Sequence, residues 1–152
     1  MSKPSERLKE LGLTLPTPPK PVASYVPCVK HGDLLLLSGQ IPMKDGKVAF
    51  TGQVGLKQKL EDAQEAARVC TLNAIAVAAD HGGGIDSLKQ VLKVVVYVAS
   101  HEGFTEQHKV ANGASDLLKD IFGDAGRHAR AAVGVFSLPL DASVEVDVTF
   151  AV

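Results

Sequence analysis

Two runs of alternating residues near the C-terminus constrain the fold most. Residues 130–135 (RAAVGV) and 144–152 (VEVDVTFAV) both place apolar side chains at every second position. This period of two predicts β-strands that each bury one face. A proline and an aspartate lie in the segment between the runs, and both are typical turn residues. We therefore expect the two strands to pair as a hairpin, which would set Arg130 opposite Glu145 near one surface of a sheet.

The composition is that of an ordinary globular domain. The chain has 152 residues, of which 45% are apolar and 22% charged, and its formal net charge is -1. This length predicts a single domain with a substantial core. A nearly neutral chain offers no electrostatic attraction for nucleic acids or anionic membranes, so we expect neither as a partner.

The N-terminus has no apolar stretch of the signal-peptide type. No later segment is long and apolar enough to span a bilayer, so we expect a cytoplasmic protein. Cys28 and Cys70 fit neither a CxxC motif nor a metal-ligand spacing. In a reducing compartment they are expected to be buried free thiols.

Residue spacing predicts the secondary structure of the rest of the chain. We expect a short helix over residues 5–12, an extended proline-rich segment over 14–21, strands over 22–30 and 34–38, a hairpin turn at 44–47 with a return strand over 48–51, an alanine-striped helix over 58–81, a central strand over 91–99 and a second helix over 104–122. This order predicts an α+β fold with a mixed sheet and helices on one face. An oligomer is the simplest way to cover the other face.

Other polar residues give weaker indications. The five histidines do not have the helical spacing of a metal site, so no metal ligand is predicted. His128, two residues before Arg130, is placed to reach a pocket around that arginine. Asn73 in the long helix is interpreted as a structural polar residue that hydrogen bonds satisfy. The glycines at 82–84 follow a helix rather than precede one, so a phosphate-binding loop is not expected.

The order and spacing of several motifs resemble the YjgF-like, or reactive intermediate deaminase (Rid), family over residues 22–152. The motifs that carry the resemblance are the SGQIP stretch at 38–42, the helix that holds Asn73, the Val-Ala-Asn sequence at 110–112, Arg130 followed by a strand and Leu-Pro, and the Val-Glu-Val sequence at 144–146. The resemblance divides the chain into an N-terminal extension, residues 1–21, and a single Rid-like domain, residues 22–152.

The resemblance implies a fold and an activity. The fold is that of the AroH-type chorismate mutases, a mixed β-sheet with two helices packed on one face, assembled as a homotrimeric barrel with a ligand pocket at each subunit interface. Deaminase members of the family hydrolyse reactive enamines and imines, such as 2-aminoacrylate, to 2-keto acids and ammonia. They use neither a metal nor a cofactor.

The resemblance also assigns roles to individual residues. Arg130 and Glu145 fall on the catalytic positions, and Arg130 is also the clamp for the substrate carboxylate. Tyr25, Ser38 and Asn112 fall on the positions that bind substrate. The clamp has a physical basis, because a guanidinium matches a planar carboxylate with two parallel charge-assisted hydrogen bonds. A carboxylate such as Glu145 can orient a water molecule or carry a proton during imine hydrolysis.

The sequence leaves several functions open. One is the deaminase, and another is a non-catalytic trimer that binds a small carboxylate ligand in a regulatory or scavenging role. Ala132 stands where the family often has a cysteine, and Ala23-Ser24 replaces the family's Gly-Pro before its pocket tyrosine, which favours the second function slightly. A chorismate mutase is less favoured, since only one cationic group can be named for its site. Arg130 could also form no more than an ion pair with Glu145 within the sheet.

Overall fold

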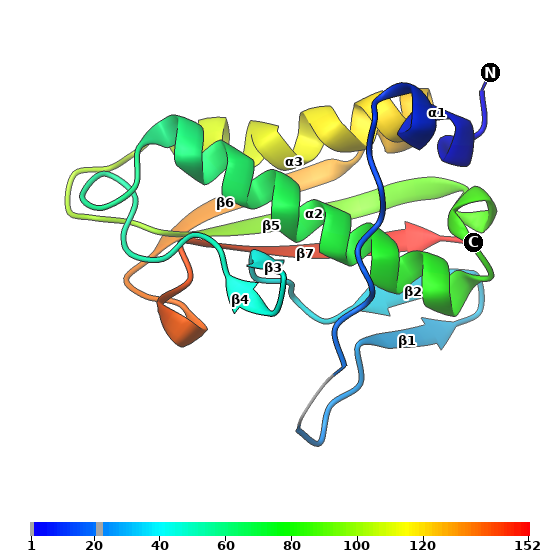
Figure 1. Cartoon of the computed structure of the whole chain (residues 1–152), viewed down its shortest axis with the longest axis horizontal. Coiled ribbons are helices and arrows are strands. Elements are labelled where there is room, and N and C mark those ends of the chain that lie inside the picture. Colours follow the sequence, from blue (N-terminus) through cyan, green and yellow to red (C-terminus); the bar gives the residue numbers. More distant parts are fainter. Residues whose placement is uncertain (1, 21–22) are drawn as a thin grey trace.

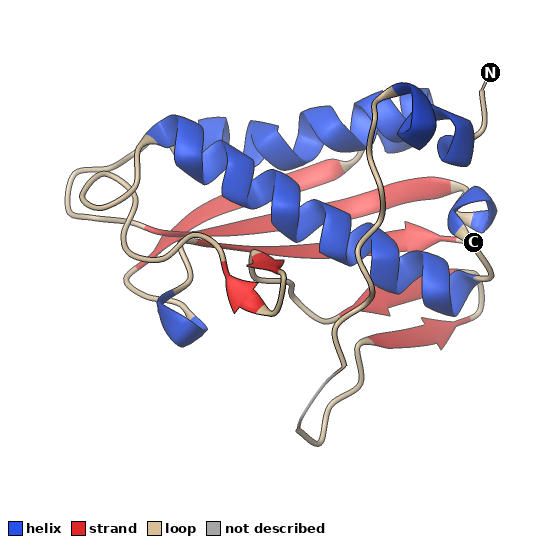
Figure 2. Ribbon diagram, viewed as in Figure 1, coloured by secondary structure: helices blue, strands red, loops and turns tan. Residues whose placement is uncertain are grey.

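The computed structural model describes residues 2–20 and 23–152, and it has a mixed five-stranded sheet with helices on one face (Figures 1 and 2). The helices are α1 (Pro4–Glu10), α2 (Leu60–Gly82) and α3 (Gln107–Phe122), with 3-10 turns η1 (Ile85–Ser87), η2 (Gly123–Gly126) and η3 (Pro139–Asp141). The strands of the sheet are β1 (Cys28–His31), β2 (Leu34–Leu37), β5 (Gln90–Ala99), β6 (Ala129–Val135) and β7 (Val144–Ala151). A separate hairpin is formed by β3 (Met43–Lys44) and β4 (Lys47–Val48).

The strand order in the sheet is β1-β2-β7-β5-β6. Strands β5 and β6 are parallel, and every other neighbouring pair is antiparallel. Helix α3 supplies the crossover that a parallel pair requires. The hairpin expected between β6 and β7 is therefore wrong, because β5 lies between them and pairs with both. Alternation indicates which face of a strand is buried, but it does not identify the neighbouring strand.

The core lies between the sheet and the two long helices. Alternate residues of β5 and β7 are buried on the helical side, where α2 packs an alanine-rich face against them. Gly113 lets α3 approach α2 closely, since a Cβ added there would lie 2.2 Å from the backbone oxygen of Gln64. The predicted layer of two helices on one face is confirmed, and the shorter α1 packs against α3 as a third helix.

The opposite face of the sheet carries exposed apolar side chains. Val29 on β1, Leu34 and Leu36 on β2, and Val133 on β6 are between 38% and 53% exposed. The half-buried carboxylates of β7 lie on this same face, because they occupy the strand positions between its buried valines. No helix of the described residues covers this face (Figure 2). Such an apolar surface is typical of a protein interface.

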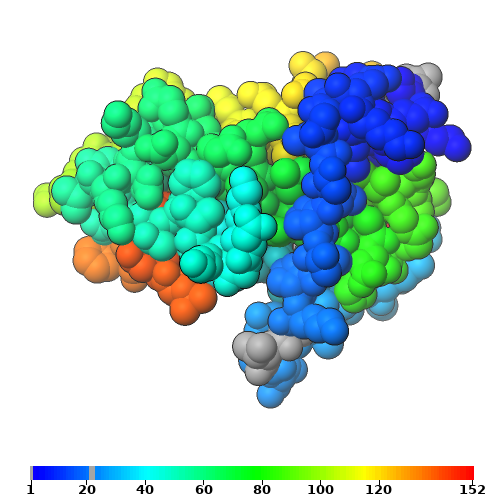
Figure 3. Space-filling view, viewed as in Figure 1, coloured from blue at the N-terminus to red at the C-terminus, as the bar shows by residue number. Residues whose placement is uncertain are grey.

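The N-terminal residues run over the helical layer. Arg7 of α1 donates a hydrogen bond to the backbone oxygen of Asp120, and Ser5 bonds to Asp86. Residues 13–19 then cross α2 without regular secondary structure and reach the neighbourhood of β1 (Figures 1 and 3). We call them the N-terminal strap. The extended conformation predicted from the prolines is confirmed up to residue 20, and the end of that prediction, residue 21, lies outside the described residues.

The predicted elements are present with shifted boundaries. Helix α3 begins three residues later than expected, and α2 ends at Gly82, with Gly83 in the left-handed conformation at φ 90°. The strand predicted over 22–30 is found only at Cys28–His31, and Val22 lies outside the described residues. The return strand predicted over 48–51 is only two residues long, Lys47–Val48. The prediction of two free, buried cysteines is confirmed.

Candidate functional site

Arg130 lies on the edge strand β6 and on the helical side of the sheet. It pairs with Val94, which is fully buried beneath the helices, and paired residues on neighbouring strands share a face. Its Nη1 donates to Oδ1 of Asn112 at 2.9 Å and to Oγ of Ser115 at 3.2 Å. Asn112 and Ser115 are three residues apart on α3 and therefore lie on the same face of that helix. One nitrogen of the exposed guanidinium is thus anchored, which leaves the other two for a ligand.

A chain of hydrogen bonds continues behind Ser115. Its hydroxyl lies 2.9 Å from Nε2 of His128, and Nδ1 of His128 lies 2.6 Å from the backbone oxygen of Gly126. A backbone oxygen only accepts, so Nδ1 of His128 donates to Gly126, and this bond turns Nε2 toward the Ser115 hydroxyl. The Ser115 oxygen then accepts from Arg130. We call Asn112, Ser115, His128 and Arg130 the arginine cluster.

Glu145 lies on β7, on the opposite side of the sheet. It pairs with Tyr97, and the residues on either side of it in the strand are buried under the helices. Gly39 packs against its carboxylate, since a Cβ added to Gly39 would lie 2.2 Å from Oε1 of Glu145. Burial raises the pKa of Glu145, and the nearby charge of Asp147 raises it further. The pKa of Asp147 is also raised by its own burial.

Ser38 directly follows β2, and Tyr25 lies three residues before β1, the strand that pairs with β2. The Ser38 hydroxyl donates to the backbone oxygen of Val26 at 2.6 Å, which ties the loop that holds Tyr25 to the end of β2. The Tyr25 side chain is 58% exposed. Ser38 directly precedes Gly39, the residue in contact with Glu145. We call Tyr25, Ser38, Gly39 and Glu145 the carboxylate cluster.

The two clusters do not meet within one chain. Arg130 pairs with Val94 and Glu145 with Tyr97, so their backbones lie two strands apart, about 10 Å across the sheet, and three residues apart along β5. Their side chains point to opposite faces. The expectation that Arg130 stands opposite Glu145 is therefore wrong, and so is the simple ion pair between them. The cause is the intervening β5, together with the odd offset of three residues, which reverses the side-chain direction.

The structure divides the five predicted site residues into two groups. Arg130 and Asn112 are hydrogen-bonded in one cluster. In the other, Glu145 contacts Gly39, the residue after Ser38, and Tyr25 is linked to Ser38 only through the hydrogen bond at Val26. Sequence reasoning missed Ser115 and the contact of Gly39 with Glu145. Ser115 could have been found, because it lies three residues after Asn112 on a predicted helix and therefore on the same helix face. Nothing in the sequence indicated the contact of Gly39 with Glu145. His128 does reach the neighbourhood of Arg130, as expected, but through Ser115.

Two further features are absent from the described residues. Residues 2–20 and 23–152 contain no group of three or more histidine, cysteine, aspartate or glutamate side chains arranged to hold a metal ion. No helix in that part of the chain is long and apolar enough to cross a membrane.

The fold and this pair of clusters define a small α+β domain of the chorismate mutase-like class with an arginine and a glutamate at its candidate site. A family model described as "YjgF/chorismate mutase-like, putative endoribonuclease" matches residues 5–151. Protein TCP17 of Trypanosoma cruzi is 45% identical over 141 residues, which cover 92% of this chain and 88% of that protein. The chain belongs to the YjgF/chorismate mutase-like family.

Solved structures share the whole fold. A protein of unknown function from Agrobacterium tumefaciens, Atu1372, is 47% identical with a TM-score of 0.88, covering 98% of this chain and 91% of that one. A Shewanella oneidensis protein described as a "putative endoribonuclease" is 34% identical with a TM-score of 0.96, covering 99% and 100%. A more distant relative from Dermatophagoides farinae is 27% identical over 135 residues, which cover 89% of this chain and 91% of that protein. It is named a 2-iminobutanoate/2-iminopropanoate deaminase.

Proposed function

We propose that the protein hydrolyses small 2-imino acids and their enamines, such as 2-aminoacrylate, to 2-keto acids and ammonia. The observation that carries the proposal is the anchored guanidinium of Arg130. Its Nη1 is held by Asn112 and Ser115, so the planar group is oriented before a ligand arrives while its remaining nitrogens stay exposed. A preorganised, exposed guanidinium favours a planar carboxylate over a point anion.

The proposal includes a second copy of the chain. The arginine cluster and the carboxylate cluster lie on opposite faces of one sheet, so a pocket that uses both needs a neighbouring subunit. The exposed apolar surface around the carboxylate cluster supports this, because residues such as Leu36 and Val133 would be buried by it. We propose a homotrimer with one pocket at each subunit interface.

The chemistry follows from the two clusters. Arg130 would hold the carboxylate of the imine, and Glu145 of the neighbouring copy would accept a proton from the attacking water. The raised pKa of Glu145 makes it a stronger base than an ordinary carboxylate. The C–O bond forms at the imine carbon while this proton passes to the imine nitrogen, which gives a carbinolamine. The hydroxyl proton of the carbinolamine then moves to the nitrogen through Glu145, and breaking of the C–N bond gives the keto acid and ammonia. The substrates are intrinsically unstable, so few catalytic groups suffice.

Two related proteins support a small-molecule site of this kind. The Dermatophagoides farinae relative is named for the hydrolysis of 2-iminobutanoate and 2-iminopropanoate. The Escherichia coli protein TdcF, which shares the fold at a TM-score of 0.65 and 22% identity, was solved with bound serine. A cytoplasmic location is part of the proposal and agrees with the unpaired Cys28 and Cys70.

One observation favours a second function, a trimer that binds a small carboxylate without turning it over. Ala132 follows Arg130 on the same face of β6 and offers no polar group beside the guanidinium. Tyr25 also lies in an exposed loop that lacks the family's Gly-Pro sequence. A binding protein needs only the anchored arginine, whereas a catalyst also needs the glutamate.

The release of ammonia and pyruvate from 2-aminoacrylate generated in the cuvette distinguishes the two functions. The deaminase predicts faster release with wild-type protein and no acceleration with Glu145→Gln. Equal rates with wild type, Glu145→Gln and no protein would contradict the deaminase, and tight pyruvate binding by the same sample would then establish the binding protein. A monomer mass by light scattering at micromolar concentration would contradict the trimer.

A further inference from the structure

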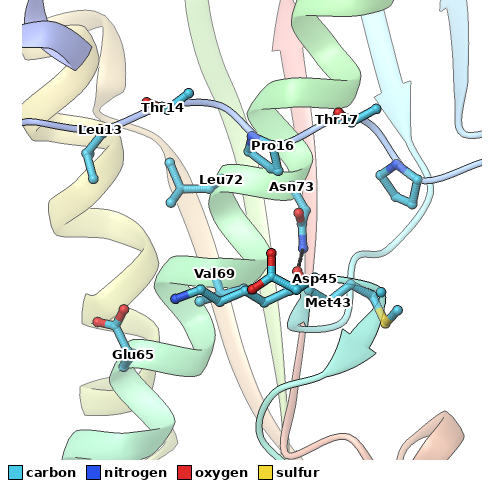
Figure 4. A pocket seen from close by; sticks show the side chains of 13 residues that line it. Leu13, Thr14, Pro16, Thr17, Met43, Asp45, Glu65, Val69, Leu72 and Asn73 are labelled. Atoms are coloured by element: carbon cyan, nitrogen blue, oxygen red, sulfur yellow. Dashed lines mark hydrogen bonds between the residues drawn. The ribbon is translucent and has the colours of Figure 1, made fainter.

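A cavity of about 620 Å³ lies beneath the N-terminal strap, and none of its lining residues belongs to either cluster. It opens between the strap, the β3–β4 hairpin and α2 (Figure 4). Glu65, Val69, Leu72 and Asn73 form its wall on α2, and their spacing places them on one face of that helix. The volume falls within the range of roughly 300–1,000 Å³ that is usual for small-molecule sites.

The lining of this strap cavity is largely apolar on three sides. The apolar residues come from the strap, the hairpin and the helix in turn: Leu13, Pro16, Pro19, Met43, Val69 and Leu72. Prolines fix the backbone of the strap, so the cavity does not depend on a freely moving segment. A ligand with a compact apolar body would bury its surface against all three elements.

Asn73 places a hydrogen-bond acceptor in this apolar lining. Its side chain is 3% exposed, and its Nδ2 donates to the backbone oxygens of Ile41 at 3.3 Å and Met43 at 3.0 Å. Because backbone oxygens only accept, the amide nitrogen must face the hairpin and Oδ1 must face away from it. Figure 4 shows the amide in this orientation, with its oxygen on the side of the strap. The structural role predicted for Asn73 from the sequence is confirmed for the nitrogen.

The oxygen of Asn73 has no hydrogen-bond partner among the described residues. Every fully buried side-chain nitrogen or oxygen in that part of the chain has one, so this oxygen is reached from the cavity. A ligand that donates to this oxygen keeps it hydrogen-bonded when the apolar body of the ligand displaces solvent from the cavity, whereas a ligand without a donor leaves it unpaired at a cost. The group that fits is an N–H or O–H donor.

The charges at the rim decide between neutral and anionic ligands. Asp45, two residues after the backbone oxygen that Asn73 contacts, adds a second acceptor at the same end. Lys44 beside it carries the opposite charge, and Glu65 at the other end pairs with Arg68 at 3.5 Å. The rim is therefore close to neutral, and the end of the cavity at Asn73 and Asp45 offers two acceptors. An anion would meet two acceptors there.

We propose that the strap cavity binds a neutral small molecule with a compact apolar body and an N–H donor, such as a primary amide. The donor bonds to Oδ1 of Asn73, and the apolar body lies against Val69, Leu72 and the strap prolines. This site is independent of the deaminase proposal, since the two share no residue.

The test is a titration of the full chain, labelled with 13C on its methyl groups, followed by NMR. The probe is hexanamide, and the matched control is N,N-dimethylhexanamide, which has the same body but no N–H donor. Hexanamide should shift the methyl signals of Leu13, Val69 and Leu72 with a dissociation constant on the order of 1 mM, as expected for a ligand of this size. The dimethyl amide should bind about tenfold more weakly, because it leaves the acceptor without a partner. Equal binding of both amides, or no shift of these methyl signals, would overturn the proposal.

Two variants that fill the cavity and one matched control outside it locate the binding site. Thr17→Trp fills the mouth of the cavity from the exposed strap and should abolish the shifts, whereas Leu11→Trp adds the same side chain outside the cavity and should leave them unchanged. Val69→Phe fills the cavity from the helix side and should act like Thr17→Trp, with a thermal melt to check folding. Unchanged hexanamide binding by folded Thr17→Trp would contradict the assignment. All three variants should bind pyruvate with the affinity of wild type, because none of the changed residues belongs to the proposed deaminase site. A failure of the cavity proposal can therefore be told apart from a failure of the deaminase proposal.

Discussion

The arginine cluster and the carboxylate cluster are held in different ways. The arginine cluster is a continuous hydrogen-bonded set, in which Asn112 and Ser115 fix the guanidinium and His128 fixes Ser115. In the carboxylate cluster, Glu145 is positioned by packing against Gly39, and it lies on the face of the sheet that no helix of the described residues covers (Figure 2). The pKa of Glu145 is raised because partial burial disfavours its charged form. One cluster is complete in a single chain, while the other has the properties of an unfinished site.

The largest expected effect comes from removing the centre of the arginine cluster. Arg130→Ala should weaken binding of pyruvate or 2-ketobutyrate at least about thirtyfold. The reason is that the proposed neighbouring subunit would bury the pair of Arg130 and the ligand carboxylate, and truncating one partner of such a pair costs roughly 2–5 kcal/mol. Arg130→Lys should fail almost as completely, since an ammonium lacks the planar fork. Calorimetric titration measures both, with a thermal melt as the control for folding. Equal affinity in wild type and Arg130→Ala would remove the clamp from the account.

A smaller effect is expected from the residues that hold Arg130. Ser115→Ala removes one of the two bonds to Nη1 and should weaken keto-acid binding about two- to tenfold, the range that a single net hydrogen bond predicts. His128→Ala should have a similar or smaller effect, because it acts only through Ser115. Asp116→Ala, at an exposed neighbouring position on α3, is the matched control and should bind normally. A loss as large as that of Arg130→Ala would mean that Ser115 itself touches the ligand.

The smallest expected effect is on stability, and it concerns the carboxylate cluster. Because the folded-state pKa values of Glu145 and Asp147 are raised, the folded chain binds more protons than the unfolded chain in the pH range above their ordinary values of about 4. The free energy of unfolding should therefore fall as the pH rises through that range. Urea denaturation at fixed protein concentration should show this slope in wild type and a reduced slope in Glu145→Gln/Asp147→Asn.

Asp86 provides a control of opposite sign for the same experiment. Its hydrogen bonds with Ser5 lower its pKa, so its contribution to stability is present above the unfolded pKa and is lost as the pH falls. Asp86→Asn should leave the falling slope from Glu145 and Asp147 in place. If the free energy of unfolding of wild type instead rises steadily from pH 4 to pH 7, the pKa values of Glu145 and Asp147 are not raised in the folded chain.

The sequence predicted the strands and helices well because their periodic patterns are local. The valine run of β5, the alanine stripe of α2 and the alternation in β7 each report the burial of one face, and all three elements are found within one or two residues of their predicted bounds. The pairing of the strands was not local. Strand β5 entered between β6 and β7, and no alternation in those two strands could indicate it.

The candidate site was predicted in composition but not in arrangement. The resemblance named Arg130 and Glu145, yet their positions on opposite faces depend on the register of two strands with a third, and one residue of offset reverses a side chain. The contacts that position Glu145 could not be predicted from the sequence for a related reason. Gly39 and Glu145 are more than a hundred residues apart in sequence, and only the fold brings them together.

The central claim is that one ligand site is built from the two clusters of different copies, and mixing two inactive variants tests it most directly. Arg130→Ala keeps the carboxylate cluster, and Glu145→Gln keeps the arginine cluster. Each is expected to be inactive alone. When the two are unfolded and refolded together in equal amounts, about a quarter of the interfaces should combine an intact Arg130 with an intact Glu145 from a neighbour. Ammonia release from 2-aminoacrylate should then return to about a quarter of the wild-type rate. A refolded mixture as inactive as its two parents would contradict a site shared between copies.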